Sequence, residues 1–207
     1  MLSPGSVKSL EKLGRVRLSK NFFMRDFLYS EVSNFHRIPN IPDDPELAIK
    51  SGKRLCEEIL EPLQATFGRI SIRSGYRSSK LNKFCNEKKL GCAGNEMNWA
   101  GHIWDKRDKE GKMGAVACIV VNWYLDKYER TNDFRPLAWW IHDNLPYSRM
   151  DFFPNLCAFN IGWHEQNRKK SVWSYAAPKG YLTKEGMDNY LGDHSEFYPN
   201  FPKLSRI

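Results

Sequence analysis

The chain has 207 residues, of which 41% are hydrophobic and 27% are charged, proportions typical of a soluble globular domain. Its longest apolar runs fall well short of the roughly 18 residues that a membrane-spanning helix needs, which excludes such a helix. The net charge of +8 suits anionic partners. Its basic clusters lack the glycines and aromatics of a known RNA-binding motif, so we expect no sequence-specific nucleic-acid binding.

The N-terminus and the cysteines indicate a reducing compartment. No apolar stretch follows the first residues, so we expect no secretory signal peptide. The cysteines are odd in number, with no CxxC pair, and we expect reduced and mostly buried thiols. The spacing of Cys85 and Cys92 matches no zinc-finger pattern. The five are Cys56, Cys85, Cys92, Cys118 and Cys157.

We expect a single domain with appended ends. Residues 1–17 read as a basic, weakly structured arm, and residues 18–175 as the folded core. Residues 176–207 are rich in Gly, Pro, Asp and Tyr, and we expect this extension to wrap the surface.

The expected elements follow in chain order. Pro45 suits the first turn of a helix whose apolar residues form one stripe, and Gly68 suits its C-terminal cap. Residues 69–74 alternate strictly and predict a half-buried strand. The remaining expectations are a short helix over 81–90, a buried strand over 114–121, helices over 123–130 and 136–144, and strands over 156–163 and 172–175. These elements predict an α+β fold, in which helices pack against a small, mainly antiparallel sheet.

Three segments carry a resemblance to a known family. They read LSKNF at 18–22, ILEPL at 59–63, and IRSGYRS at 72–78 followed by LN at 81–82. This pattern resembles the compact zinc D-Ala-D-Ala carboxypeptidases and L-Ala-D-Glu endopeptidases, which cut peptidoglycan and often occur as phage lysis enzymes. The resemblance spans about residues 18–175 and implies a peptidoglycan-metallopeptidase-like fold.

The resemblance also implies a substrate-binding turn. It assigns Ser74, Tyr76 and Arg77 to substrate binding, with Arg77 at the position that polarises the substrate beside the metal. A guanidinium suits this role because it offers a planar fork of donors to a carboxylate or a developing oxyanion.

A catalytic zinc in this family has three protein ligands and an open position for water. The first ligand position falls on His102, and the second, an aspartate in the family, falls on Cys118. Residues 103–113 form an insertion between the two. A thiolate can bind zinc, so the exchange at Cys118 does not by itself remove the site.

The third ligand position has two alternatives. The natural alignment of FNIGW at 159–163 places Asn160 there, whereas a register slip of four residues would place His164 there. The slip needs a bulge or a re-paired strand, so we expect Asn160, whose side chain should point toward His102 and Cys118. The expected general base is missing, and Asp151 is the nearest upstream acid.

The sequence offers two other candidate sites. If residues 103–113 were helical, His102, Asp105 and Asp108 could bind a metal together with Cys118, but neighbouring lysines and arginines favour a solvated charged loop. Cys118 with His102 could also form a nucleophile–base pair. A cysteine in a buried strand is normally inert, so we expect neither site.

These observations lead to a non-catalytic, peptidoglycan-peptidase-like protein with a degenerate zinc site. We expect a structural or cell-wall-binding component of a bacteriophage virion, made in the host cytoplasm, with other virion proteins or peptidoglycan as partners. Zinc is implied by the resemblance, but the exchanged ligands lead us to expect its absence. The alternative is an active zinc peptidase that cuts cell-wall stem peptides and uses His102, Cys118 and His164.

Overall fold

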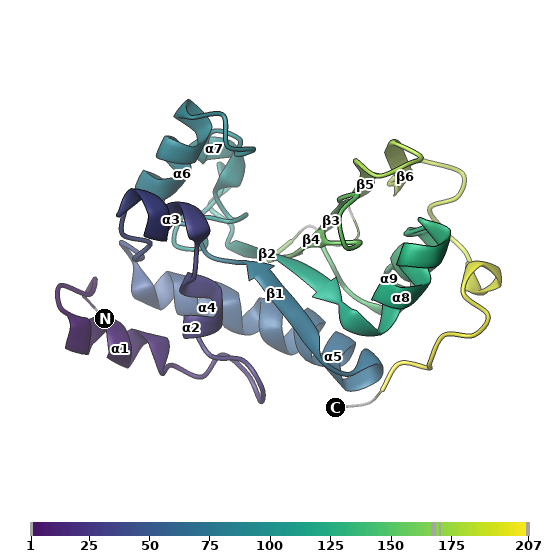
Figure 1. The fold of residues 1–207 in the computed structure, drawn as a ribbon, viewed down its shortest axis with the longest axis horizontal. Coiled ribbons are helices and arrows are strands. Elements are labelled where there is room, and N and C mark those ends of the chain that lie inside the picture. Colours follow the sequence, from purple (N-terminus) through teal and green to yellow (C-terminus); the bar gives the residue numbers. More distant parts are fainter. Residues whose placement is uncertain (1, 167–168, 170, 206–207) are drawn as a thin grey trace.

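The computed structural model describes residues 2–166, 169 and 171–205 as an α+β fold around one six-stranded sheet (Figure 1). The strand order is β1-β2-β4-β3-β5-β6, and every neighbouring pair is antiparallel except β3 and β5. The predicted fold class, with a mainly antiparallel sheet, is therefore confirmed. The strands are β1 (Ile70–Ser74), β2 (Gly114–Val121), β3 (Arg149–Phe152), β4 (Phe159–His164), β5 (Ser171–Ser174) and β6 (Gly180–Lys184).

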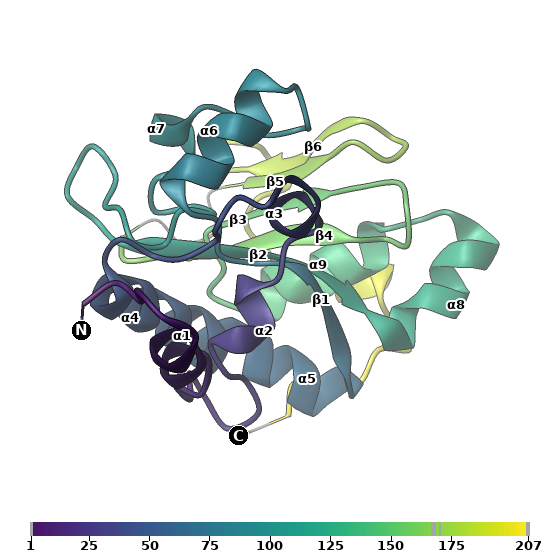
Figure 2. The ribbon, with the colours of Figure 1, turned by 60° about the vertical axis from the view of Figure 1, so that its left-hand side comes forward.

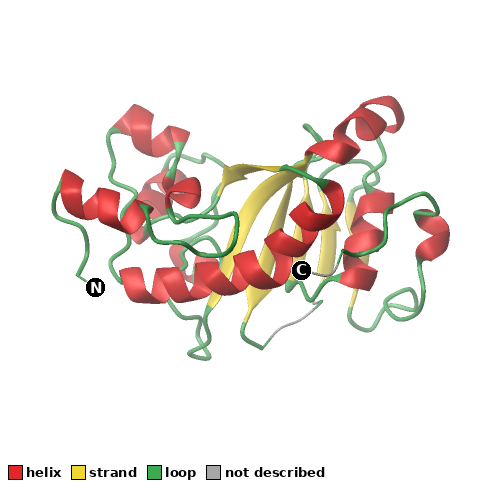
Figure 3. Cartoon of the chain, turned by 90° about the horizontal axis from the view of Figure 1, so that it is seen from below, coloured by secondary structure: helices red, strands yellow, loops and turns green. Residues whose placement is uncertain are grey.

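Helices flank the sheet on both sides and at its end (Figures 1 and 2). Their bounds are α1 (Val7–Gly14), α2 (Arg25–Leu28), α3 (Glu31–His36), α4 (Pro45–Leu55), the π-helical turn η1 (Cys56–Leu60), α5 (Glu61–Phe67), α6 (Ser79–Glu87), α7 (Asn95–Asn98), α8 (Asn122–Thr131), α9 (Arg135–Asn144) and the 3-10 turn η2 (Ser195–Phe197). The stretch α4–η1–α5 runs continuously along one face of the sheet, as seen from below in Figure 3.

The start and end of this long helix follow from its sequence. The side chain of Asp44 accepts a hydrogen bond of 3.0 Å from the backbone N–H of Leu47, and Pro45 occupies the first turn. Gly68 has a φ of +77°, a conformation that glycine adopts without strain, and ends the helix. The predicted helix limits are confirmed.

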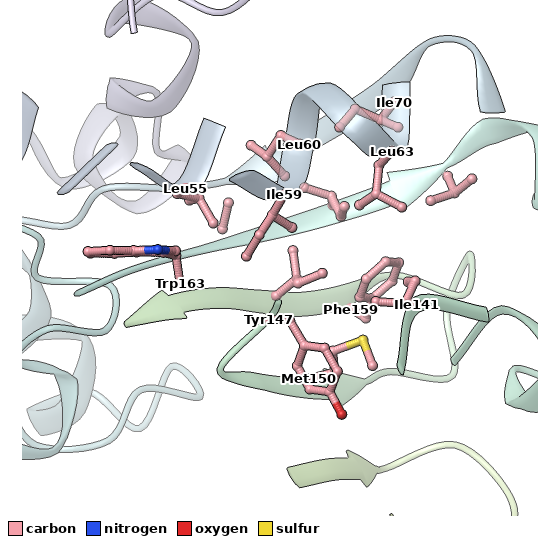
Figure 4. Packing of buried hydrophobic residues seen from close by; sticks show 14 of the residues in the cluster. Leu55, Ile59, Leu60, Leu63, Ile70, Ile141, Tyr147, Met150, Phe159 and Trp163 are labelled. Carbon is pink, nitrogen blue, oxygen red and sulfur yellow. The ribbon is translucent and has the colours of Figure 1, made fainter. Parts of the chain in front are cut away.

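The core lies between α4–η1–α5 and one face of the sheet. Leu55, Ile59 and Leu63 project from the helix toward Phe159 and Trp163 of β4 (Figure 4). Burying each such side chain contributes about 1.5–3 kcal/mol. Because strand side chains alternate between faces, every second residue of β2 and β4 points away from this core, and those residues form the opposite face of the sheet.

The two ends of the chain are more structured than their composition predicts. The arm over residues 1–17 contains α1, whose cap is the side chain of Ser6, and Leu13 on this helix is fully buried. The sheet continues beyond residue 175, because β6 pairs with β5. The extension then passes over α9, where Trp140 donates a 2.9 Å hydrogen bond to the carbonyl of Pro202.

The insertion over residues 103–113 is only partly the solvated loop that its charges predict. Ile103 and Trp104 are fully buried, and the indole of Trp104 donates a 3.0 Å hydrogen bond to the carbonyl of Val116. Asp105 is 2% exposed and accepts a 2.7 Å hydrogen bond from the backbone N–H of Asp43. The first third of the insertion therefore belongs to the core, where it fixes the loop before α4.

None of the helices in the described part of the chain has the length and apolarity that crossing a membrane requires.

Candidate functional site

A row of polar and aromatic side chains crosses the sheet on the face opposite α4–η1–α5. Strand pairing places its members directly side by side, one from each strand, and all are half-buried or exposed. In strand order the row is Ser74, Cys118, Asn160, Asp151, Trp173 and Tyr181. We call these six residues the cross-sheet row.

A groove of about 490 Å³ opens over the β1–β2 end of this row. The start of α3 and the turn after β1 form part of its wall, and the loop at 153–158 forms another part. Arg73 and Arg77 contribute to the lining, together with three thiols, those of Cys85, Cys92 and Cys118. The groove is therefore polar, sulfur-rich and bordered by positive charge.

His102 is held against the substrate-binding turn that the resemblance assigns. Its Nδ1 donates a hydrogen bond of 3.0 Å to the carbonyl of Gly75, and its own carbonyl accepts a 2.8 Å bond from the backbone N–H of Arg77. Because a carbonyl can only accept, Nδ1 carries the proton and Nε2 keeps its lone pair. The turn and His102 thus fix each other's position.

The environment of His102 keeps the imidazole neutral. Burial, and then the positive charge of Arg77, lower the pKa of His102 to about 3, and Arg149 adds to the same effect. The side chain of Asn160 is in hydrogen-bonding contact with His102.

Asn160 lies beside Cys118 as well as His102. The register pairs Asn160 with Cys118 on one side and with Asp151 on the other. Its amide Nδ2 donates a 3.4 Å hydrogen bond to Asp151, whose carboxylate also lies 3.7 Å from Nε of Arg149. The structure thus brings three predicted positions, His102, Cys118 and Asn160, to one place.

His164 occupies a different place on the same strand. Four residues separate it from Asn160, which corresponds to about 13 Å along a strand. Its Nε2 donates to Asp108 at 2.9 Å, and its Nδ1 accepts a 3.2 Å bond from the backbone N–H of Gln166. The side chain of His164 is therefore engaged by the insertion and does not face His102.

Cys118 carries a protonated thiol at neutral pH. Burial raises its pKa to about 11, although the nearby charges of Arg73 and Arg77 act in the opposite direction. Since the thiolate is both the nucleophile and the metal ligand, this environment disfavours either role.

The three residues assigned to substrate binding have different surroundings. Ser74 is half-buried in the cross-sheet row. Tyr76 is 2% exposed, and its ring packs edge-on against Trp104 with centroids 6.2 Å apart. The guanidinium of Arg77 donates bonds of 3.0 Å each to Oδ1 of Asn82 and Sγ of Cys92. Tyr76 therefore supports the turn from the core, while Arg77 lies at the groove wall.

A second group of titratable residues lies at the far end of the fold. Within the described ranges, His142, Asp143 and His194 are the only three His, Cys, Asp or Glu ligands whose atoms approach within 4.8 Å of one another. Nδ1 of His194 lies 2.7 Å from Oδ1 of Asp143, and its Nε2 lies 3.0 Å from the carbonyl oxygen of Asn189. His142 donates from Nε2 to the carbonyl of Tyr190 at 2.8 Å. These bonds fasten the C-terminal extension onto α9.

Sequence reasoning did not identify Arg149 or the His142–Asp143–His194 group. Arg149 and Asp151 alternate along β3, which places both on the groove face once the strand is recognised. No local sequence pattern predicts that His194 bonds to α9, because 51 residues separate His194 from its partner Asp143.

Comparisons of the chain with protein-family models, with curated proteins and with solved structures find no match.

Proposed function

We propose that the chain is a non-catalytic protein with a peptidoglycan-peptidase-like fold, and that it serves as a structural or cell-wall-binding component of a bacteriophage virion. One observation carries the proposal. An amide side chain, Asn160, lies where the family resemblance requires the third zinc ligand, directly beside His102 and Cys118. An amide is a hard, neutral oxygen donor and a poor substitute for imidazole at zinc.

The groups around Asn160 support the same conclusion. Cys118 is a protonated thiol at neutral pH and would have to lose its proton in order to bind a metal. The only carboxylate in the cross-sheet row, that of Asp151, is already engaged by Asn160 and Arg149. No acid stands at the position of the family's general base, since residues 157–161 carry none.

The charge of the groove suits a cell-wall partner. Arg73, Arg77 and Arg149 all act on the His102–Cys118 region and leave it with excess positive charge. Cell-wall stem peptides end in carboxylates, which arginine binds through paired hydrogen bonds. Binding without cleavage needs only this charge and shape, and no metal.

Metal content and wall hydrolysis test the non-catalytic assignment. For protein purified without chelators, we expect substoichiometric zinc and no release of fragments from whole cell walls, with the His102→Ala variant behaving identically. Stoichiometric zinc together with hydrolysis that is lost in His102→Ala would overturn the proposal in favour of an active zinc peptidase. That enzyme would need His164 to leave Asp108 and join His102 and Cys118.

Cosedimentation with purified peptidoglycan tests the wall-binding role. Replacing Arg73 by Gln removes a charge at the groove, and we expect weaker binding by on the order of tenfold, the loss of one charge-assisted contact. Arg135→Gln is the matched control, because Arg135 pairs with Asp133 at 2.8 Å on a different part of the surface. Equal binding by both variants would exclude the groove as the binding surface.

The location in a virion needs a separate test. Mass spectrometry of purified phage particles would detect the chain if it is a virion component.

A further inference from the structure

Two of the five thiols, those of Cys85 and Cys92, lie together at the groove wall. Cys85 is on α6 and 2% exposed, whereas Cys92 is half-buried in the following loop. The chain reverses between them through Lys89 and Gly91, whose φ angles are +56° and +77°, and the N–H of Leu90 donates a 2.9 Å bond to the carbonyl of Cys85. This reversal brings Cys92 close enough to act on the thiol of Cys85, and both thiols line the groove.

Neighbouring amides hold the backbone around Cys92 in place. Nδ2 of Asn86 donates a 2.8 Å bond to the carbonyl of Cys92. The next carbonyl, that of Ala93, accepts bonds of 3.0 Å from the side chains of both Asn82 and Asn98. These bonds fix the loop that carries Cys92 beside the end of α6, which carries Cys85.

Arg77 contacts this pair directly. Its Nη1 donates a 3.0 Å hydrogen bond to Sγ of Cys92. A guanidinium in this position stabilises negative charge on sulfur, and the thiolate is the form of cysteine that attacks another sulfur. Cys92 is also the more exposed of the two thiols, so it is the one that an external reagent reaches first.

The other three thiols lack this arrangement. Cys56 and Cys157 are buried in the core and do not line the groove. Cys118 lies in the same groove on β2, but the hydrogen bond of Arg77 goes to Cys92. Burial raises the pKa of Cys85 to about 11, as it does that of Cys118, so the more exposed Cys92 is the thiol that attacks first. The pair at 85 and 92 is thus chemically distinct within the described chain.

We propose that Cys85 and Cys92 are a reversible disulfide-forming site that exchanges with small-molecule disulfides of the glutathione type. The Cys92 thiolate attacks one sulfur of glutathione disulfide, forms a mixed disulfide and releases one glutathione thiolate, which takes up the proton that Cys92 lost. Cys85 then gives its proton to solvent and attacks Sγ of Cys92, which releases the second glutathione as a thiolate that is protonated in turn. The protein loses two hydrogens, and one glutathione disulfide becomes two glutathione thiols.

The bond would alter the groove through Arg77. In the reduced form Nη1 of Arg77 bonds Oδ1 of Asn82 and Sγ of Cys92, and only the Cys92 thiolate, which the disulfide lacks, offers the guanidinium a charged acceptor. Oxidation therefore frees Arg77 to turn toward anionic ligands in the groove. This consequence for the groove rests on the proposed wall-binding function, but formation of the disulfide does not.

Mass spectrometry of the full-length chain tests the site. Reduced protein is incubated in mixtures of glutathione and glutathione disulfide, the free thiols are trapped with a maleimide, and peptides are mapped. We expect a cross-linked Cys85–Cys92 peptide that a reductant removes. The Cys85→Ser variant should instead retain one glutathione on Cys92, and the matched control Cys118→Ser should form the bond as the unaltered protein does.

Three results would overturn the site: no cross-link in the unaltered protein, a mixed disulfide that accumulates on Cys92 while Cys85 stays free, or a cross-link that disappears in Cys118→Ser. Replacing Arg77 by Gln should slow the reaction on the order of tenfold, the loss of one hydrogen bond from a charged donor. An unchanged rate would contradict the role of Arg77. The assay contains neither metal nor cell wall, so its failure is distinguishable from failure of the proposed function.

Discussion

The carbonyl oxygen of Gly75 accepts the Nδ1 proton of His102 at 3.0 Å, and this contact joins the turn after β1 to the loop after α7. Gly75 can hold this position only because it has no Cβ. A Cβ there would lie 2.7 Å from two side-chain atoms of Phe27, which is fully buried. The contact between Gly75 and His102 therefore depends on the packing beneath the turn.

Replacing Gly75 by Ala should consequently destabilise the protein by about 1–3 kcal/mol, the usual cost of overpacking. Urea unfolding measures the change. Gly94→Ala is the matched control, because Gly94 has a φ of −59° and an added Cβ would meet nothing within 4 Å, so we expect a change below about 0.5 kcal/mol. Equal effects at the two positions would refute the packing argument.

Asn160→His should create a zinc site. The substitution adds an imidazole beside His102 and Cys118 and completes three ligands. We expect zinc affinity to rise at least tenfold, about 1.4 kcal/mol, in calorimetric titration at neutral pH. Ser171→His adds the same side chain to the same sheet face on β5 and should bind zinc no better than the unaltered protein. A gain in both variants would mean that the three positions do not act together.

Stability should fall in acid partly because of His102. Its pKa is lowered from 6.5 to about 3 in the folded protein, so below pH 6.5 the unfolded chain binds a proton that the native state does not. The free energy of unfolding should therefore decrease between pH 6.5 and about 3, by at most about 1.4 kcal/mol per pH unit from this residue. Burial also lowers the pKa of His142, which adds an effect of the same sign.

The His102→Gln variant isolates this contribution. Urea unfolding at several pH values should give a shallower acid slope for the variant than for the unaltered protein, since glutamine does not titrate. The carboxylates titrate in both proteins and cancel in the difference. Parallel slopes would show that His102 is protonated normally in the folded state.

His194→Ala should loosen the C-terminal extension. The imidazole stacks on Trp139 with centroids 4.0 Å apart and bonds Asp143 at 2.7 Å, so its removal leaves a half-buried carboxylate partly unpaired. We expect a loss of about 1–3 kcal/mol and faster hydrogen exchange over residues 189–201. Ser195→Ala alters an exposed neighbour and should change neither. Unchanged exchange in His194→Ala would mean that the extension is held elsewhere.

Elements in which apolar residues recur at a regular spacing could be predicted from the sequence. The strand expected over 114–121 matches β2, and the alternating residues at 69–74 correspond to β1 at 70–74. β6 was missed because its sequence lies among Gly and Pro residues and carries no extended alternation. Whether such a segment forms a strand is decided by a free sheet edge nearby, here that of β5, which no local pattern reveals.

The candidate site was predictable only one segment at a time. Local motifs indicated Arg77, His102, Cys118 and Asn160, each from its own stretch of chain. The distances between segments depend on strand register and on chain reversals, so the contact between Cys85 and Cys92 and the position of Arg149 near His102 required the fold. The displacement of His164 toward Asp108 likewise depends on how the insertion folds back.

The alternation of side chains along β2 and β4 divides the residues of these two strands into two sets, one on each face of the sheet. Ala117, Ile119 and Ile161 belong to the core, while Cys118 and Asn160, their immediate neighbours in sequence, lie in the cross-sheet row on the opposite face. Substitutions in the second set do not change the side chains that pack in the first. A sheet of this kind can therefore change the residues of its groove face while the residues that hold its core stay the same.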